Sequence, residues 1–213
     1  MKYIKNMKFP RAFLKQTFLL LLVCTCTSAA SSTSSKASLS AYIPSLTFER
    51  QTWNNCGPAS VVGVLGAYGF KVSQEDAKKI LRPTGVGYMT VDVIDGFVQQ
   101  YGLRATHFRS GNLESVKRTI NLGIPVLVLQ WLRGAGEGSS FVGEIPHFRT
   151  VRGYDDKQKT FWVDDPMLGA NATISYKDFL TLWSVYNNDF IPIYPKGMES
   201  VLERTLGVRI PRT

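Results

Sequence analysis

The stretch Gln51-Thr52-Trp53-Asn54-Asn55-Cys56-Gly57-Pro58-Ala59-Ser60 opens the first helix-forming segment of the folded part of this chain. Apolar residues recur beyond it until Gly69, a residue type that commonly ends helices, so a helix is predicted from about Cys56 to Ala67. Asn54 or Asn55 is suited to cap this helix, which places Cys56 at its positive end. A thiol in that position ionises more readily, and the thiolate is the nucleophilic form. The pattern therefore predicts a reactive cysteine at a helix N-terminus.

Residues 1–30 have the three-part pattern of a cleavable signal peptide. Basic residues without any acid precede an apolar core from Phe18 to about Cys26, and small residues follow up to Ala30. The core is shorter than the ~20 apolar residues of a membrane-spanning helix, which disfavours an uncleaved anchor. We expect cleavage after Ala30, export, and no stable membrane insertion afterwards. Lipid attachment at Cys24 or Cys26 is a less favoured alternative, because the residues before these cysteines match a lipoprotein signal poorly.

Export leaves Cys56 as the single cysteine of the mature chain. It then has no partner for an internal disulfide, which favours a reactive role over the common alternative of a packed core cysteine. One cysteine and two separated histidines, His107 and His147, do not make a metal ligand set, so we expect no metal and no cofactor.

The formal net charge of +9 overstates the basicity of the mature chain. The leader holds five of the 25 basic residues and none of the 16 acids, which leaves 20 against 16, or +4. The remaining basic residues are scattered, and they form no stripe with aromatic residues between them. This argues against a nucleic-acid-binding protein.

The rest of the chain is predicted to form one domain, with a linker before it and a tail after it. Residues 31–45 are rich in Ser, Ala and Thr and are predicted to be a flexible linker, the folded domain is expected over 46–195, and 196–213 is expected to be a peripheral tail. Helices are predicted over 56–67, 73–82, 90–101 and 112–122, followed by a strand over 124–131, a hairpin of 147–152 with 160–163, a helix over 176–183 and a strand over 190–194. This order predicts an α+β fold, with an N-terminal helical half packed on an antiparallel sheet.

The predicted hairpin brings an acid beside a histidine. If its turn is centred near Asp156, facing residues have numbers that sum to about 312, so His147, at the opening of the first strand, lies opposite residue 165, give or take one. Asp164 and Asp165 occupy that place, and only one of them can point at His147 because side chains alternate between strand faces. His107 has no acid near it in the sequence and is predicted to be a structural surface histidine.

These residues make a candidate nucleophilic site. A cysteine nucleophile needs a base and a third group that orients the base, which His147 and one of the two aspartates can supply. Gln51 can join the backbone N–H of Cys56 in stabilising an oxyanion, as acyl transfer requires. Trp53 either flanks the groove or packs against the first helix. The glycine-rich loop over 133–143 is either a lid or a plain connection.

Three short motifs carry a family resemblance: Gln51 with Cys56-Gly57-Pro58-Ala59, then Pro146-His147-Phe148, then Asp165-Pro166 with Gly169. Together they resemble the peptidase C39-like family, papain-like cysteine peptidases related to the bacteriocin-processing enzymes. The resemblance covers about residues 46–195 and implies the papain-like cysteine peptidase fold. It also implies that Cys56 is the nucleophile, His147 the general base, Asp165 the orienting acid and Gln51 the oxyanion donor.

Two features depart from the pattern. Gln51 lies five residues before Cys56, whereas papain-like enzymes usually place this glutamine six before, so Asn54 or Asn55 is an alternative donor. The run Gly134-Ala135-Gly136-Glu137-Gly138 lacks the Gly-Lys-(Ser/Thr) ending of a P-loop, although the best-known members are fused to an ATP-binding transporter.

The sequence thus predicts an exported papain-like cysteine peptidase that acts on peptide or protein substrates. The alternatives are a non-catalytic C39-like module that binds peptides or cell wall, and a cysteine amidase or acyl transferase on the same fold.

Overall fold

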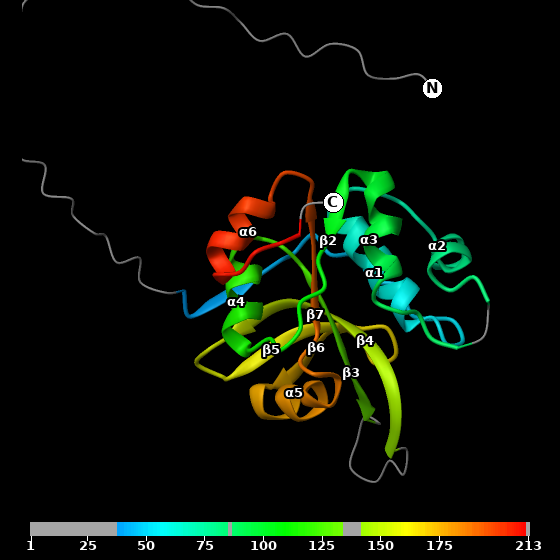
Figure 1. Cartoon of the computed structure of the whole chain (residues 1–213). Helices are drawn as coiled ribbons and strands as arrows, with labels where there is room; N and C mark the ends of the chain where they lie inside the picture. Colours follow the sequence, from blue (N-terminus) through cyan, green and yellow to red (C-terminus); the bar gives the residue numbers. More distant parts are fainter. Residues whose placement is uncertain (1–37, 85–86, 134–141, 212–213) are drawn as a thin grey trace, which may run out of the picture. The chain divides into compact units, whose positions relative to one another are not determined.

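The structure is a computed structural model and describes residues 38–84, 87–133 and 142–211 (Figure 1). The predicted signal peptide, 1–30, and most of the predicted glycine-rich loop lie outside these ranges. No helix within the described ranges combines the length and the apolar character that crossing a membrane requires.

The helices of the first half follow the predicted order. They are α1 (Cys56–Ala67), α2 (Gln74–Leu81), α3 (Val93–Val98), which continues into the 3-10 turn η1 (Gln99–Tyr101), and α4 (Leu113–Asn121). Ser73 and Asn112 cap α2 and α4 with their side chains, as side chains of this type commonly do. The start of α3 was predicted too early, because Asp92 rather than Thr90 precedes its first turn.

The second half supplies most of an antiparallel sheet. Its strands are β1 (Ser40–Tyr42), β2 (Leu103–Ala105), β3 (Val126–Arg133), β4 (Val142–Asp155), β5 (Thr160–Asp165), β6 (Gly169–Ser175) and β7 (Phe190–Pro195), in the order β2-β7-β3-β4-β5-β6 with β1 paired to β4. Helix α5 (Tyr176–Trp183) joins β6 to the 3-10 turn η2 (Ser184–Tyr186), and α6 (Glu199–Leu206) follows β7. The predicted α+β class is confirmed.

Two segments that were predicted to lie outside the domain belong to it. Strand β1 falls in the predicted linker, 31–45, and the next residue, Ile43, is buried in the core. Helix α6 falls in the predicted tail, 196–213, and buries Leu202 in a small apolar cluster with Ile124 and Tyr194. Both segments are short and rich in polar residues, so their apolar contacts made no periodic pattern in the sequence.

Helix α1 is held deep in the domain. Ten of its twelve residues are buried, and it contacts α2 and β4. Two glycines allow this close fit: a Cβ on Gly63 would lie 2.8 Å from the carbonyl oxygen of Thr47, and one on Gly57 would lie 2.6 Å from the methyl group of Met89. In Figure 1, α1, α2 and α3 lie together, and α5 lies apart from them across the strands. The N-terminus of α1, and with it Cys56, is therefore fixed against β4.

The residues that follow β1 contact a buried ion pair between β4 and β5. Arg152 of β4 donates to Asp164 of β5 at 3.0 Å and to the carbonyl oxygens of Ile43 and Pro44 at 3.2 and 3.3 Å. The backbone N–H of Ile43 donates in return to the carbonyl of Arg152 at 2.7 Å. The segment after β1 thus supplies two acceptors to a buried guanidinium, a group that is costly to leave without acceptors.

We predict that a chain beginning at residue 46 is less stable than one beginning at residue 38. Losing buried Ile43 and two acceptors of Arg152 should lower the free energy of unfolding by about 2–4 kcal/mol. Urea denaturation of the two chains measures this difference. Equal urea midpoints would show that β1 adds nothing to the fold.

Candidate active site

Cys56 is the first residue of α1, as predicted, but the predicted side-chain cap is absent. Asn55 occupies the cap position and makes no side-chain hydrogen bond to the helix. Its amide instead donates to Thr52 Oγ1 at 2.6 Å and to Glu75 Oε1 at 3.2 Å. The N–H groups of the first turn are therefore left for other acceptors, and such a turn favours an anion.

The Cys56 thiol is one such acceptor. Burial raises the pKa of this thiol, but a hydrogen bond with His147, the charge of that imidazole, and backbone N–H groups of Phe148 and Gly57 together lower the pKa below its ordinary value. The side chain is 7% exposed, so these partners rather than water stabilise the thiolate.

His147 lies between Cys56 and a carboxylate. Its Nε2 is 2.8 Å from Asp165 Oδ1, which leaves Nδ1 as the nitrogen for Cys56. Burial lowers the pKa of His147, yet the hydrogen bonds to Asp165 and to Cys56 outweigh burial and raise this pKa above its ordinary value. Both residues are buried, His147 at 2% and Asp165 at 0% exposed.

Asp165, and not Asp164, faces His147. The Asp164 carboxylate binds Arg152 and the backbone N–H of Asn171, on the other side of the strand. Asp165 Oδ1 accepts from His147 and from the backbone N–H groups of Met167 and Leu168 at 2.8 and 3.1 Å, and its Oδ2 accepts from Arg149 Nε at 2.6 Å. Burial raises the pKa of Asp165, but His147, Arg149 and the backbone donors hold it well below its usual range.

The predicted register of the hairpin was wrong by two to three residues. The observed pairs are Asp155 with Thr160 and Thr150 with Asp164, whose numbers sum to 315 and 314, with a bulge between them. His147 lies inside β4 rather than at its opening. Continuing this register sets Asp165 opposite Arg149, so the carboxylate contacts that residue directly and His147 diagonally.

Gln51 lies in a segment that is tied to the loop after Asp165. Its backbone N–H donates to the carbonyl of Pro166 at 3.0 Å, and Arg50 donates to the carbonyl of Met167 at 2.8 Å. The Oε1 of Gln51 is buried and has no hydrogen-bond partner among the described residues. The two alternative donors are engaged elsewhere, because the amide of Asn54 donates to Gly87 and that of Asn55 donates to Thr52. These bonds leave Gln51 as the candidate oxyanion donor.

The sequence also led to predictions for Trp53, His107 and the glycine-rich loop. Trp53 is 79% exposed, so it does not pack against α1. The exposed His107 is paired with Asp189, at 2.7 Å, an acid 82 positions away that no local search of the sequence would find. Residues 134–141 of the glycine-rich loop, which is expected to be either a lid or a plain connection, lie outside the described residues.

Sequence reasoning missed Arg149. The guanidinium is buried against Asp165, although arginine normally lies at the surface. A clue was present, because Arg149 follows His147 by two positions in a strand, so both side chains share one face.

We predict that Cys56 of the chain beginning at residue 31 alkylates with iodoacetamide at lower pH than a free thiol, whose pKa is ~8.5. His147→Gln removes the group that stabilises the thiolate, so the rise of the rate with pH should move to higher pH. Alkylation rates across a pH series measure the pH dependence of the unaltered chain and of His147→Gln, with glutathione as the free thiol for comparison. Midpoints that coincide for the two chains and glutathione would refute the pairing of Cys56 with His147.

Solved structures of low sequence identity share this fold. A protein from Bacillus anthracis described as a C39-like peptidase has a TM-score of 0.57 and 15% identity, over 74% of this chain and 98% of that one. The peptidase domain of Streptococcus ComA, a bi-functional ABC transporter in a quorum sensing pathway, has a TM-score of 0.54 and 16% identity, over 71% and 99%. A double glycine motif protease from an AMS/PCAT transporter, solved with a leader peptide, has a TM-score of 0.52 and 16% identity, over 73% and 95%. The predicted papain-like fold is confirmed.

Family membership comes from the sequence match. No curated protein matches the chain. The model of the Peptidase_C39 like family, however, matches residues 42–190, which is well over half of the chain. The match spans α1 with Cys56, β4 with His147 and β5 with Asp165. The chain therefore belongs to the Peptidase_C39 like family.

Proposed function

We propose that this chain is a cysteine peptidase that hydrolyses peptide bonds through Cys56, His147 and Asp165. One observation carries the proposal: the buried imidazole of His147 bonds both the Cys56 thiol and the Asp165 carboxylate. This arrangement of nucleophile, base and orienting acid is the one that acyl transfer needs. Membership of the family supports the same reaction class.

The proposed reaction begins with attack of the Cys56 thiolate on the carbonyl carbon of the substrate. The developing oxyanion is stabilised by the N–H of Cys56, in the uncapped first turn of α1, and by the side chain of Gln51. The His147 imidazolium gives its proton to the leaving amine as the C–N bond breaks, which leaves a thioester on Cys56. His147 then takes a proton from water, the resulting hydroxide displaces the thiolate, and the acid product leaves.

In this scheme Asp165 holds His147 and does not exchange protons. Its pKa lies far below that of His147, because His147, Arg149 and backbone N–H groups all bind its charged form. A carboxylate in that state fixes the ring orientation and stabilises the imidazolium. This is why Asp165, despite its distance in sequence from Cys56, belongs to the proposed machinery.

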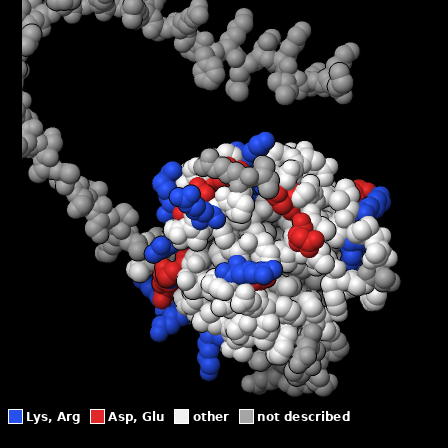
Figure 2. Space-filling view, viewed as in Figure 1, with Lys and Arg blue, Asp and Glu red and all other residues white. Residues whose placement is uncertain are grey.

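The surface around Cys56 supports a polypeptide substrate with apolar side chains. Trp53, Tyr88, Met167 and Leu168 are large apolar residues between 41% and 79% exposed. The bond from Asn54 to Gly87 ties the loop of Trp53 to that of Tyr88, and Arg50 ties the same segment to Met167 and Leu168. On the face in Figure 2, Lys and Arg side chains are separated by acidic and uncharged ones, which supports peptide over nucleic acid.

We further propose that the reaction takes place outside the cytoplasm, because residues 1–30 have the pattern of a signal peptide.

The double glycine specificity of one structural neighbour is a property of that protein. The exposed apolar side chains around Cys56 instead favour larger residues beside the cleaved bond.

The proposal is tested with a library of fluorogenic peptides that vary around the cleaved bond. The chain should cleave peptides with apolar residues fastest, keep its activity in EDTA, and lose it in Cys56→Ala. Transfer of the acyl group to an added amine, with no hydrolysis, would make the enzyme an acyl transferase instead. No turnover of any peptide would favour the non-catalytic binding module.

The two adjacent aspartates give a matched pair of variants. Asp165→Asn removes the charge that stabilises the imidazolium and should lower kcat by about 100-fold or more. Asp164→Asn breaks a buried ion pair with Arg152, so it should lower the thermal midpoint while the folded protein keeps its kcat. Measuring kcat and the thermal midpoint of both variants decides which aspartate serves the reaction and which serves the fold. Equal losses of kcat, or a larger loss in Asp164→Asn, would overturn the role of Asp165.

A further inference from the structure

A buried arginine shares the carboxylate of Asp165 with His147. Arg149 Nε donates to Asp165 Oδ2 at 2.6 Å, while His147 binds the other oxygen, Oδ1, at 2.8 Å. The side chains of Arg149 and Asp165 are 4% and 0% exposed. Each oxygen of the carboxylate thus has its own cationic or hydrogen-bonding partner, and rotation of the carboxylate would break both bonds.

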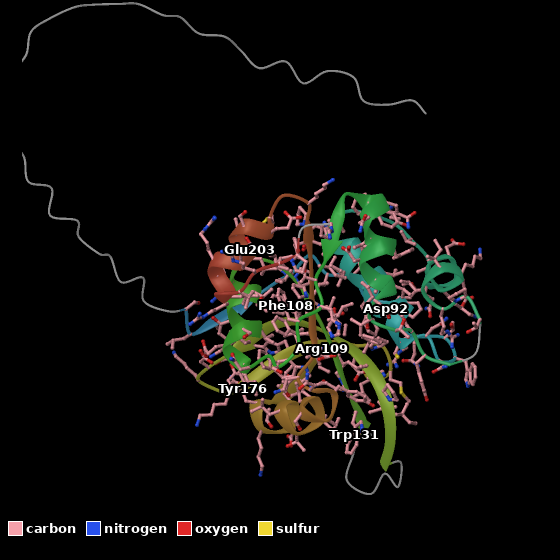
Figure 3. The ribbon with its side chains drawn as sticks, in the orientation of Figure 1. Asp92, Phe108, Arg109, Trp131, Tyr176 and Glu203 are labelled. Carbon is pink, nitrogen blue, oxygen red and sulfur yellow. The ribbon has the colours of Figure 1, made fainter. Side chains whose placement is uncertain are left out.

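Arg149 is itself fixed at its far end. Its Nη1 donates to Gln130 Oε1 at 3.1 Å and to the carbonyl of Trp131 at 3.3 Å, both on β3. Gln130 is fully buried and donates to the carbonyl of Phe179, in α5, at 3.1 Å. Trp131 lies toward the Arg133 end of β3 (Figure 3). A continuous set of buried hydrogen bonds therefore runs from Asp165 through Arg149 and Gln130 to α5.

The charge of Arg149 acts on His147 in the opposite sense to that of Asp165. A guanidinium stays protonated at all relevant pH values, so it neutralises part of the carboxylate permanently. The charged or titratable groups that act on His147 come from three elements: Cys56 from α1, Asp165 from β5 and Arg149 from β4. Gln130, its neighbour on β3, is uncharged. Of these groups, Arg149 alone disfavours the imidazolium by its charge.

We propose that Arg149 is a positioning residue of this site, which orients the Asp165 carboxylate toward His147 and limits how strongly that carboxylate stabilises the imidazolium. The inference rests on the proposed function, because it concerns the same site. It makes two separable claims, one about orientation and one about charge. A lysine at this position keeps the charge but lacks the planar fork of donors, whereas methionine lacks both.

The second buried arginine of β4 is a matched control. Arg152 also forms a buried ion pair with an adjacent aspartate of β5, at 3.0 Å, and both of these side chains are 7% exposed. It contacts Asp164 and the segment after β1, and it contacts neither His147 nor Asp165 by any of its hydrogen bonds. Arg152→Met therefore reports what the loss of a buried ion pair does to the fold alone.

The test compares Arg149→Met, Arg149→Lys and Arg152→Met with the unaltered chain by three measurements: urea denaturation, the pH dependence of kcat/KM, and the NMR titration of His147. The chain has two histidines, and His107→Gln assigns their signals. Arg149→Met should lower kcat about 10- to 100-fold, because the carboxylate loses its orientation. It should also move the titration of His147 and the alkaline limb of kcat/KM to higher pH, since a group that opposes the imidazolium is gone.

Arg149→Lys should lower kcat without moving the titration of His147 to higher pH, because the charge is kept, and it decides the orientation claim even if Arg149→Met does not fold. Arg152→Met should lower the urea midpoint and leave kcat and the titration unchanged. An unaltered kcat in Arg149→Lys, an unaltered titration in folded Arg149→Met, or the same titration shift in Arg152→Met would overturn the inference. If the unaltered chain cleaves no peptide, the proposed function fails, while the titration of His147 still decides the charge claim.

Discussion

The buried carboxylate of Asp165 is the group on which the rest of the site depends. An ionised side chain with no exposure to water is tolerated only when partners replace its hydration, and here four donors do so: His147, Arg149 and the backbone N–H groups of Met167 and Leu168. These donors come from β4 and from the turn after β5. Their convergence fixes both strands and the turn at once, so the carboxylate is a structural constraint as well as a chemical group.

The same pairing sets the electrostatics of Cys56 and the pH range in which the site is complete. The pKa of Asp165 is depressed, so its contribution to stability is present above the unfolded value, ~3.9, and is lost as pH falls through the folded value. The pKa of His147 is raised, so its contribution is complete below the unfolded value, ~6.5, and is lost as pH rises through the folded value. The ion pair is thus complete between these two unfolded values and persists somewhat beyond each of them, below ~3.9 and above ~6.5, and on the alkaline side it also favours the Cys56 thiolate.

The sequence allowed much of this to be predicted, for reasons that differ between elements. Helix α1 has long apolar continuity and a glycine after it, so its bounds were predicted correctly. The choice between Asp164 and Asp165 needed the register of β4 and β5, which the turn sets three residues away from the predicted one and a bulge then shifts by one. Strand β1 and helix α6 are short and polar, and the contact of Arg149 with Asp165 depends on that altered register. Such contacts follow from tertiary pairing, which local patterns do not specify.

Together these features describe a buried cysteine with a buried histidine and a buried carboxylate beside it, three positions after the exposed Trp53. Labelling with a peptide that carries a thiol-directed electrophile in place of its cleaved carbonyl tests this most directly, because the label requires both the nucleophile and the peptide-binding surface. Mass spectrometry should find the label on Cys56 at neutral pH, formed faster than with iodoacetamide and slowed strongly in His147→Gln and Asp165→Asn. A label that forms no faster than with iodoacetamide, or that is indifferent to both substitutions, would contradict a cysteine peptidase site at Cys56.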